Sequence, residues 1–486
     1  MNKKMILYMI GRISFIEGIL MLLPLFWSIG KREDCYLSFL ITICIAIGFG
    51  VLCSLVSKPK DKTIYAKEGF VIVALAWIVM SAIGALPFYL SREIPSYVDA
   101  FFETVSGFTT TGSSILPNLE ELSQGILLWR SFTHWVGGMG VLVLVMAILP
   151  TESGRSMHIM RAEMPGPIVG KLVPKIKSTA KILYLIYIAL TALEMIMLLF
   201  GRVSVFESLI YSFGTAGTGG FGIKTDSLTS YSPYIQWVIA IFMLIFSVNF
   251  NLYYLMLVKK IKSALKSEEL WFFVVVVLIA TGIITANIYP VYKNFSETLR
   301  TSVFQVAAIV STTGFATADF NLWPTLSKSV IFILMFMGGC AGSTAGGLKV
   351  SRVMVLFKSI RANLRHLLHP RSVVSVRLEG KALDKETANS VGGYFAVYML
   401  CLTVVFFILS FEKFDIETNL TAAVTCFNNV GPGLSKVGPM GGFGGYSAVS
   451  KVTLSGAMLL GRLEIFPMLL LFSPSIWLRK GKKVRR

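Results

Sequence analysis

Charged residues are scarce in this chain: Asp, Glu, Lys and Arg together make up 15% of its 486 residues, against 55% that are hydrophobic. Soluble domains are about one quarter charged, so the composition excludes an ordinary soluble protein. Many apolar runs reach the roughly 20 residues that a helix needs to cross the hydrocarbon core of a bilayer. The sequence therefore predicts an all-α polytopic membrane protein with no soluble domain.

Clusters of metal-binding or catalytic residues are also missing from the sequence. The six cysteines show no metal-ligand spacing and the four histidines form no cluster, so neither a disulfide framework nor a zinc site is indicated. A membrane enzyme would need clustered His, Asp or Glu within its spans, and we predict no catalytic residues. The stretch 338–347 lacks the phosphate-loop pattern, and no G-x-G-x-x-G fingerprint follows a strand. No cofactor is therefore expected in this chain.

Acidic residues are few, 26 against 45 Lys and Arg, which gives a net charge of +19. The basic residues cluster near 3–12, 58–67, 155–181, 259–266, 349–377 and 479–486. All of these clusters fall on one side if the intervening spans alternate, as the positive-inside rule requires. The charge therefore indicates membrane topology and not nucleic-acid binding. It predicts a multi-pass protein of the cell inner (cytoplasmic) membrane with both termini in the cytoplasm.

The expected spans divide into an opening pair and four repeating units. The opening pair, about 5–29 and 36–57, starts like a signal peptide but lacks a cleavage site, so we expect it to be retained. Each unit consists of a span, a short amphipathic segment, a glycine loop and a second span. The units are expected at 68–91, 97–109, 110–114 and 124–150; at 178–200, 204–216, 217–221 and 232–258; at 270–290, 297–310, 311–317 and 326–369; and at 387–410, 416–427, 428–434 and 451–478.

The short segments cannot cross a bilayer, so each must enter and leave on the same side. Irregular backbone at membrane depth is tolerated where it lines a water-filled cavity or is buried in protein. Four such units predict the four quarters of one pore around a pseudo-fourfold axis. The matching domain boundaries are 1–66 for the N-terminal hairpin and 67–160, 161–267, 268–380 and 381–486 for pore repeats one to four.

The glycine loops are the predicted cation filter. Rings of backbone carbonyls can replace the hydration shell of a cation, and aiming successive carbonyls at one axis needs backbone conformations that glycine adopts cheaply. We align the loops on Gly112, Gly219, Gly314 and Gly431; four loops in one frame favour a filter over ordinary interhelical loops. The predicted cation-binding residues are Thr110, Thr111, Gly112, Thr218, Gly219, Gly220, Thr312, Thr313, Gly314, Asn429, Val430 and Gly431.

A second irregularity lies in the third repeat, where five glycines fall within the ten residues 338–347. Each glycine costs a helix up to about 1 kcal/mol relative to alanine, so we expect a broken helix whose middle is an intramembrane loop beneath the filter. The alternative is a small-residue face for close helix packing. The predicted gate residues are Gly338, Gly339, Gly342, Ser343, Thr344, Gly346, Gly347 and Arg462.

Three further polar side chains lie within predicted spans. An intramembrane charge is usually paired or lines a polar path, so we interpret Arg462 as an electrostatic barrier below the filter, with a structural ion pair as the alternative. Glu464 is too close in sequence to lie on the same helix face as Arg462, so the partner of Arg462 is expected elsewhere in the chain. Arg130 and His134 are interpreted as interfacial anchors near the outer surface.

These motifs resemble the superfamily of potassium transporters called Trk, Ktr and HKT, over almost the whole chain. The resemblance rests on Thr-Val-Ser-Gly-Phe-Thr-Thr-Thr-Gly-Ser at 104–113, Trp-Val-Gly-Gly-Met-Gly at 135–140, Ser-Thr-Thr-Gly-Phe at 311–315, Asn-Asn-Val-Gly-Pro-Gly-Leu at 428–434 and Gly-Arg-Leu-Glu at 461–464. The two opening helices favour the TrkH branch over the shorter KtrB branch. The second repeat departs most, with Ala-Gly-Thr-Gly-Gly at 216–220.

The resemblance implies potassium-selective uptake through a gated, channel-like pore, with K⁺ bound at the filter residues and Rb⁺ and Na⁺ as further candidate ions. Gly112 stands where some sodium-permeable plant relatives carry serine. The resemblance also implies a homodimer in the lipid bilayer and a separate cytoplasmic TrkA-like RCK subunit that binds the regulatory nucleotide. The alternative is a sodium-permeable or ion-coupled secondary transporter, whose broken helices would lie at the midplane, although its inverted repeats are missing.

Overall fold

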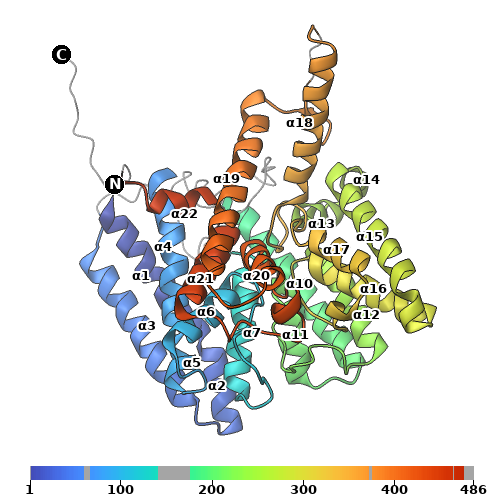
Figure 1. Cartoon of the computed structure of the whole chain (residues 1–486). Helices are drawn as coiled ribbons and strands as arrows, with labels where there is room; N and C mark the ends of the chain where they lie inside the picture. The colour runs from blue at the N-terminus through green and yellow to red at the C-terminus, as the bar shows by residue number, and fades with distance from the viewer. Residues whose placement is uncertain (1, 60–65, 141–175, 372–374, 464, 475–486) are drawn as a thin grey trace, which may run out of the picture.

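The computed structural model describes residues 2–59, 66–140, 176–371, 375–463 and 465–474 of the chain. These residues are mostly α-helical (Figure 1), with one short hairpin as the strand structure that they contain, which confirms the predicted fold class. The helices are α1 Lys3–Leu20, α2 Leu22–Lys31, α3 Tyr36–Val56, α4 Ala66–Gly84, α5 Leu86–Leu90, α6 Tyr97–Phe108, α7 Gln124–Gly138, α10 Ile176–Phe200, α11 Val205–Gly217, α12 Pro233–Phe246, α13 Phe250–Leu257, α14 Ile261–Leu265, α15 Glu268–Tyr292, α16 Phe295–Val310, α17 Thr325–Leu334, α18 Val350–Leu368, α19 Lys385–Leu409, α20 Ile416–Asn428, α21 Ala448–Arg462 and α22 Ile465–Leu471.

Short non-α elements complete the described fold. Two 3₁₀ turns, η1 Phe320–Leu322 and η2 Ser435–Val437, follow the third and fourth glycine loops. A small antiparallel hairpin of β1 Arg377–Leu378 and β2 Lys381–Ala382 follows α18. In Figure 1, α18 and the start of α19 project together from one end of the molecule.

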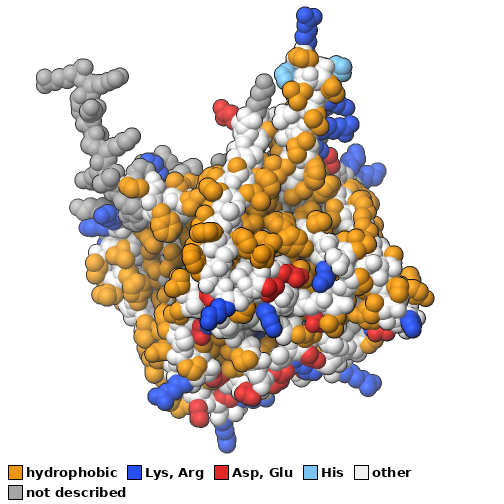
Figure 2. Space-filling model, in the orientation of Figure 1, with side chains coloured by type: hydrophobic (Ala, Val, Ile, Leu, Met, Phe, Trp, Pro, Cys, Tyr) orange, Lys and Arg blue, Asp and Glu red, His pale blue; other side chains and the backbone are white. Residues whose placement is uncertain are grey.

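Six helical segments within the described ranges are long and apolar enough to cross a membrane, and a seventh is added if α12 and α13 count as one bent span. The two at the start, Lys3–Lys31 and Tyr36–Val56, are the predicted opening pair. Hydrophobic side chains cover much of the flank of the molecule (Figure 2), as lipid contact requires. The multi-pass architecture is therefore confirmed.

The four short helices α6, α11, α16 and α20 occupy the predicted re-entrant segments. Each begins at a capping residue, Ser96, Ser204, Asn294 or Asp415, whose side chain accepts a bond from the first helical turn. The repeats follow one another around a ring: α7 of the first packs on α11 of the second, α12 of the second packs on α16 of the third, and α21 of the fourth packs on α6 of the first.

The second spans of repeats two and four are broken, contrary to the continuous helices predicted at 232–258 and 451–478. α12 ends at Phe246 and α13 continues at 90° to it, while α21 ends at Arg462 and α22 starts at Ile465. The break after α12 is stabilised from elsewhere in the chain, because the freed carbonyls of Phe246 and Ser247 accept bonds from the backbone N–H groups of Thr344 and Cys340.

Some predictions fall on residues outside the described ranges. They are residues 60–65 of the basic cluster 58–67, the end of the first repeat's second span beyond residue 140, most of the basic stretch 155–181, Glu464, the last residues of the fourth repeat's second span and the basic tail 479–486. The basic segment 349–377 is described except for residues 372–374 and forms α18 and the start of the hairpin.

Candidate ion filter and gate

The four glycine loops share one unusual backbone conformation. Each has a glycine with a positive φ, preceded two positions earlier by a non-glycine residue in the left-handed region, which L-residues rarely adopt. The glycines are Gly112 (80°), Gly220 (75°), Gly314 (80°) and Gly431 (99°). The left-handed residues are Thr110 (56°), Thr218 (55°), Thr312 (58°) and Asn429 (55°).

This pattern corrects the alignment of the second loop. The residue of repeat two that matches Gly112 in conformation is Gly220, not Gly219. The sequence has two adjacent glycines here, and aligning the second loop on the first of them, Gly219, was wrong by one residue. The twelve predicted residues still fill the same three positions in every loop, the glycine and the two residues before it.

The conformation follows from how the short helices end. In each repeat, the N–H one position before the positive-φ glycine bonds to the carbonyl five residues earlier, which is the longer bond of a Schellman motif. The pairs are Thr111 to Ser106 at 2.8 Å and, each at 2.9 Å, Gly219 to Gly214, Thr313 to Ala308 and Val430 to Thr425. Each helix therefore turns its C-terminal end, the negative end of its dipole, toward its own loop, and this favours a cation there.

The loops close a ring in which each leans on the next. A Cβ atom built on each glycine would collide with the carbonyl oxygen of the following repeat, so only glycine fits. The distances are 2.1 Å from Gly112 to the Gly219 oxygen, 2.0 Å from Gly220 to the Thr313 oxygen, 2.3 Å from Gly314 to the Val430 oxygen and 2.8 Å from Gly431 to the Thr111 oxygen. Each repeat thus contacts the next one in chain order, and the fourth repeat contacts the first.

A cavity of about 650 Å³ lies outside this ring and is lined by all four positive-φ glycines. The rest of the cavity wall consists of Arg130 and of residues that follow the four glycines, such as Phe221 and Pro432. The ring of carbonyls therefore faces a space large enough for hydrated ions. Backbone oxygens in such a ring can take the place of the water around a dehydrated cation.

Arg130 is not an interfacial anchor, as the sequence suggested, but a buried support of the filter. Its Nε lies 2.6 Å from Oε1 of Glu103 on α6, and both side chains are almost fully buried. Its Nη1 donates to the Gly222 carbonyl oxygen at 3.1 Å, and the guanidinium lies 3.4 Å from the ring centroid of Phe221. The buried ion pair thus joins the loops of repeats one and two.

The carboxylate of Glu103 also accepts bonds from the Ser114 hydroxyl at 2.9 Å and the Ile115 N–H at 3.0 Å, just after the first loop. His134, one turn beyond Arg130, is fully buried as well. The sequence carried a usable signal for this pair: a glutamate in a re-entrant helix and an arginine in a neighbouring span are both costly in a membrane unless they meet.

The predicted break in the third repeat is present and is wider than expected. α17 ends at Leu334 and α18 starts at Val350, and the chain between them forms a loop directly under the filter. The N–H of Gly346 donates to Oγ1 of the filter residue Thr312 at 2.7 Å. A Cβ built on Gly346 would lie 2.7 Å from the Cβ of Asn429, so the loop touches filter residues of two repeats.

Glu269, which the sequence did not single out, binds the middle of this loop and the first turn of α18. Its Oε1 accepts bonds from the Ala341 N–H at 2.7 Å and the Ser351 N–H at 3.0 Å. On the opposite side, the hydroxyl of Thr344 donates to the Phe246 carbonyl oxygen at 3.1 Å. The loop is therefore held between α15 and the end of α12.

Arg462 ties the loop to the first repeat. Its Nη1 donates to the Thr344 carbonyl oxygen, and its Nη2 donates to the carbonyl oxygens of Gly137 and Gly138 at the end of α7, each at 2.7 Å. The expectation that its partners lie far along the sequence is confirmed. The carbonyls of Gly137 and Gly138 are free to accept because the last carbonyls of a helix have no partner within it, and Thr344 lies in the loop between α17 and α18.

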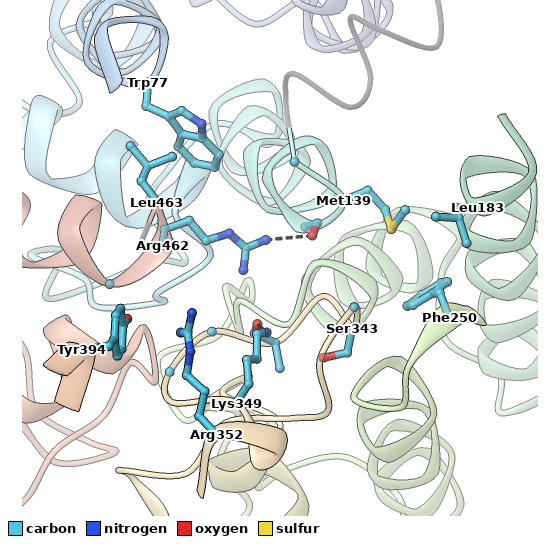
Figure 3. A pocket seen from close by; sticks show the side chains of 17 residues that line it. Trp77, Met139, Leu183, Phe250, Ser343, Lys349, Arg352, Tyr394, Arg462 and Leu463 are labelled. Atoms are coloured by element: carbon cyan, nitrogen blue, oxygen red, sulfur yellow. Dashed lines mark hydrogen bonds between the residues drawn. The ribbon is translucent and has the colours of Figure 1, made fainter. Parts of the chain in front are cut away.

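Three cationic side chains surround the small cavity below the filter. Figure 3 shows Arg462, Lys349 and Arg352 at one cavity, whose volume is about 50 Å³, space for only a few water molecules. The ammonium of Lys349 donates to the Ala345 carbonyl oxygen within the loop. The guanidinium of Arg352 lies 4.0 Å from the ring centroid of Tyr394. The passage on this side of the filter is thus narrow and positively charged.

A buried ring of four glycine loops, with a cavity on one side and a glycine-rich loop beside three cationic side chains on the other, is typical of a helical membrane protein that passes cations. The family model described as "TrkH: Cation transport protein" matches residues 37–479. The chain belongs to this family, whose members are transporters and not enzymes.

Individual relatives match over nearly the full length of the chain. The Trk system potassium uptake protein TrkH of Salmonella typhimurium is 36% identical, covering 98% of this chain and 100% of the relative. The Trk system potassium uptake protein TrkG of Escherichia coli is 30% identical, covering 98% of each. The crystal structure of the potassium transporter TrkH from Vibrio parahaemolyticus superimposes with a TM-score of 0.88 at 30% identity, covering 98% of this chain and 100% of that one.

Proposed function

We propose that this chain is the translocating subunit of a potassium uptake system and conducts K⁺ through a selective, gated, channel-like pore. The observation that carries the proposal is the ring in which each positive-φ glycine fits against a carbonyl of the next repeat. The relatives are named as potassium uptake proteins, which favours potassium over a sodium-permeable or ion-coupled transporter.

In this proposal the twelve filter residues bind K⁺ through backbone carbonyls, with no charged ligand. The oxygens stand in for water, and the negative ends of the four short helices add a field that favours a monovalent cation. Selectivity then depends on the fixed width of the ring. The tight fit of each loop against the next supports a fixed width, because neither neighbour can move independently.

The loop 338–347 and Arg462 form the gate in this proposal. The loop lies under the filter and contacts it at Thr312, which supports its role as the closed gate. Arg462, Lys349 and Arg352 add an electrostatic barrier to a cation leaving the filter. Opening requires the loop to move away from the filter, which means breaking the bonds to Arg462 and Glu269.

The pore is expected to lie in the cytoplasmic membrane with both termini inside, as a homodimer regulated by a separate TrkA-like nucleotide-binding RCK subunit. One face of the projecting α18 supports contact with another protein surface. It carries exposed apolar side chains at helical spacing, namely Phe357, Ile360, Leu364, Leu367 and Leu368. The relatives' names place them in a Trk system, which supports further components.

The test is potassium-dependent growth of bacteria that lack their own potassium uptake, complemented with this chain. The wild type should restore growth at low potassium. Gly112→Ser should lower the preference for K⁺ over Na⁺ in tracer uptake, because its side chain would meet the Gly219 carbonyl. The control is Gly456→Ser on α21, where a Cβ has nothing within 4 Å. An unaltered K⁺/Na⁺ ratio in a fully active Gly112→Ser variant would refute the filter.

A further inference from the structure

The second filter loop lacks side chains that two other loops use behind the filter. In repeat one, the hydroxyls of Thr109 and Thr111 lie 2.8 Å apart and form a hydrogen bond. In repeat three, those of Ser311 and Thr313 do the same at 2.7 Å. In both repeats the two hydroxyl residues lie three positions and one position before the positive-φ glycine. In repeat two, both equivalent positions are glycine, Gly217 and Gly219.

The space left by these glycines is filled from another repeat by His134 of α7. A Cβ built on Gly219 would lie 2.4 Å from Cγ and Nδ1 of the His134 ring and 2.6 Å from Cδ2. A Cβ on Gly217 would lie 2.3 Å from the backbone oxygen of His134. One residue of the first repeat therefore forms the back wall of the second loop.

Two contacts fix the orientation of this ring. The Nδ1 atom lies 2.7 Å from the Gly107 carbonyl oxygen on α6, and the ring centroid lies 4.1 Å from that of Phe221. The side chain is fully buried, and its Nε2 has no hydrogen-bond partner among the described residues. The His134 ring thus packs directly against Gly219, and the contact of Nδ1 with the Gly107 carbonyl holds the ring in place.

We infer that His134 is a positioning residue of the filter, which sets the place of the Gly219 carbonyl and thereby the preference for K⁺ over Na⁺. This inference rests on the proposed potassium filter. The Gly219 oxygen is itself packed against Gly112, so a shift of the second loop reaches the first. The filter is asymmetric in this respect: repeats one and three brace their loops with their own hydroxyls, and repeat two uses an imidazole from its neighbour.

The test removes the side chain of His134 and adds one at Gly219, separately and together. Gly219 has no positive φ, and the three atoms nearest to a Cβ built there all belong to the His134 ring, so we expect a methyl group to fit there once the ring is removed. In proteoliposomes, Gly219→Ala and His134→Ala should each lower the K⁺/Na⁺ flux ratio about tenfold, equivalent to roughly 1.4 kcal/mol. The double variant should recover to within about twofold of the wild type, because coupled neighbours deviate from additivity.

A second double variant is the matched control. Adding Gly217→Ala to His134→Ala should give no recovery, because the Gly217 position collides with the His134 backbone oxygen, which remains after the substitution. If His134→Ala yields no folded protein, His134→Asn replaces it. Asparagine keeps an atom at the Cγ position, 2.4 Å from a Cβ on Gly219, so a partial loss of selectivity without rescue by Gly219→Ala is expected.

The possible outcomes separate the two proposals. A wild type without preference for K⁺ would refute the potassium filter itself. A selective wild type whose ratio is unchanged in His134→Ala, or single effects that simply add in the double variant, would overturn the role of His134 and leave the filter standing.

Discussion

Replacing Arg462 with methionine should open the pore in the absence of any partner protein. The side chain links the intramembrane loop, through the Thr344 carbonyl, to the end of α7, through Gly137 and Gly138. A hydrogen bond from a charged donor contributes about 1.5–3 kcal/mol. Loss of the link to Thr344 should therefore shift the equilibrium between closed and open loops by about 10- to 150-fold.

Tracer rubidium uptake into proteoliposomes containing only this chain measures the shift. While the open state is the minor one, uptake should rise in proportion to its population. Thr344→Val is the graded control, because it removes only the neutral bond from the Thr344 hydroxyl to Phe246, worth about 0.5–1.5 kcal/mol, and should raise uptake by about 2- to 12-fold. Uptake in a folded Arg462→Met variant that equals or falls below the wild type would refute the gate.

Four further substitutions, in three experiments, test the support of the filter and of the loop. Glu103→Gln leaves the buried Arg130 without its counter-charge, a loss of about 3–5 kcal/mol, so its thermal unfolding in detergent should occur well below that of the wild type; an equal transition temperature would contradict the ion pair. Gly112→Ala should reduce potassium flux more than Gly431→Ala, since the built Cβ lies 2.1 Å from a carbonyl at the first position and 2.8 Å at the second; equal losses would argue against the ring geometry. Glu269→Gln weakens both bonds that anchor the loop and should raise partner-free rubidium uptake about fivefold, whereas unchanged uptake would show that the anchor does not restrain the loop.

The overall architecture was predictable because its signals are local. Apolar runs, short segments with capping residues such as Ser204, and a glycine after each segment specify helices and their ends without reference to the rest of the chain. The break at 338–347 was predictable for the same reason, since five glycines within ten residues destabilise a helix wherever it packs.

The details of the site that were wrong depend on distant contacts. The choice between Gly219 and Gly220 shows only in the folded backbone, where Gly220 has the positive φ and packs against the Thr313 carbonyl of the next repeat. The burial of Arg130 depends on Glu103 in another helix, and hydropathy near Arg130 alone resembles an interfacial anchor. The end of α12 at Phe246 is similarly fixed by bonds from the intramembrane loop, which no pattern within 232–258 contains.

Cation flux into proteoliposomes of the purified chain, with potassium, rubidium and sodium gradients compared, tests the central claim most directly. The ring of four carbonyl-lined loops predicts uptake of potassium and rubidium well above that of sodium, with no second driving ion. Sodium flux alone, or no flux until a second ion gradient is imposed, would contradict a potassium-selective pore.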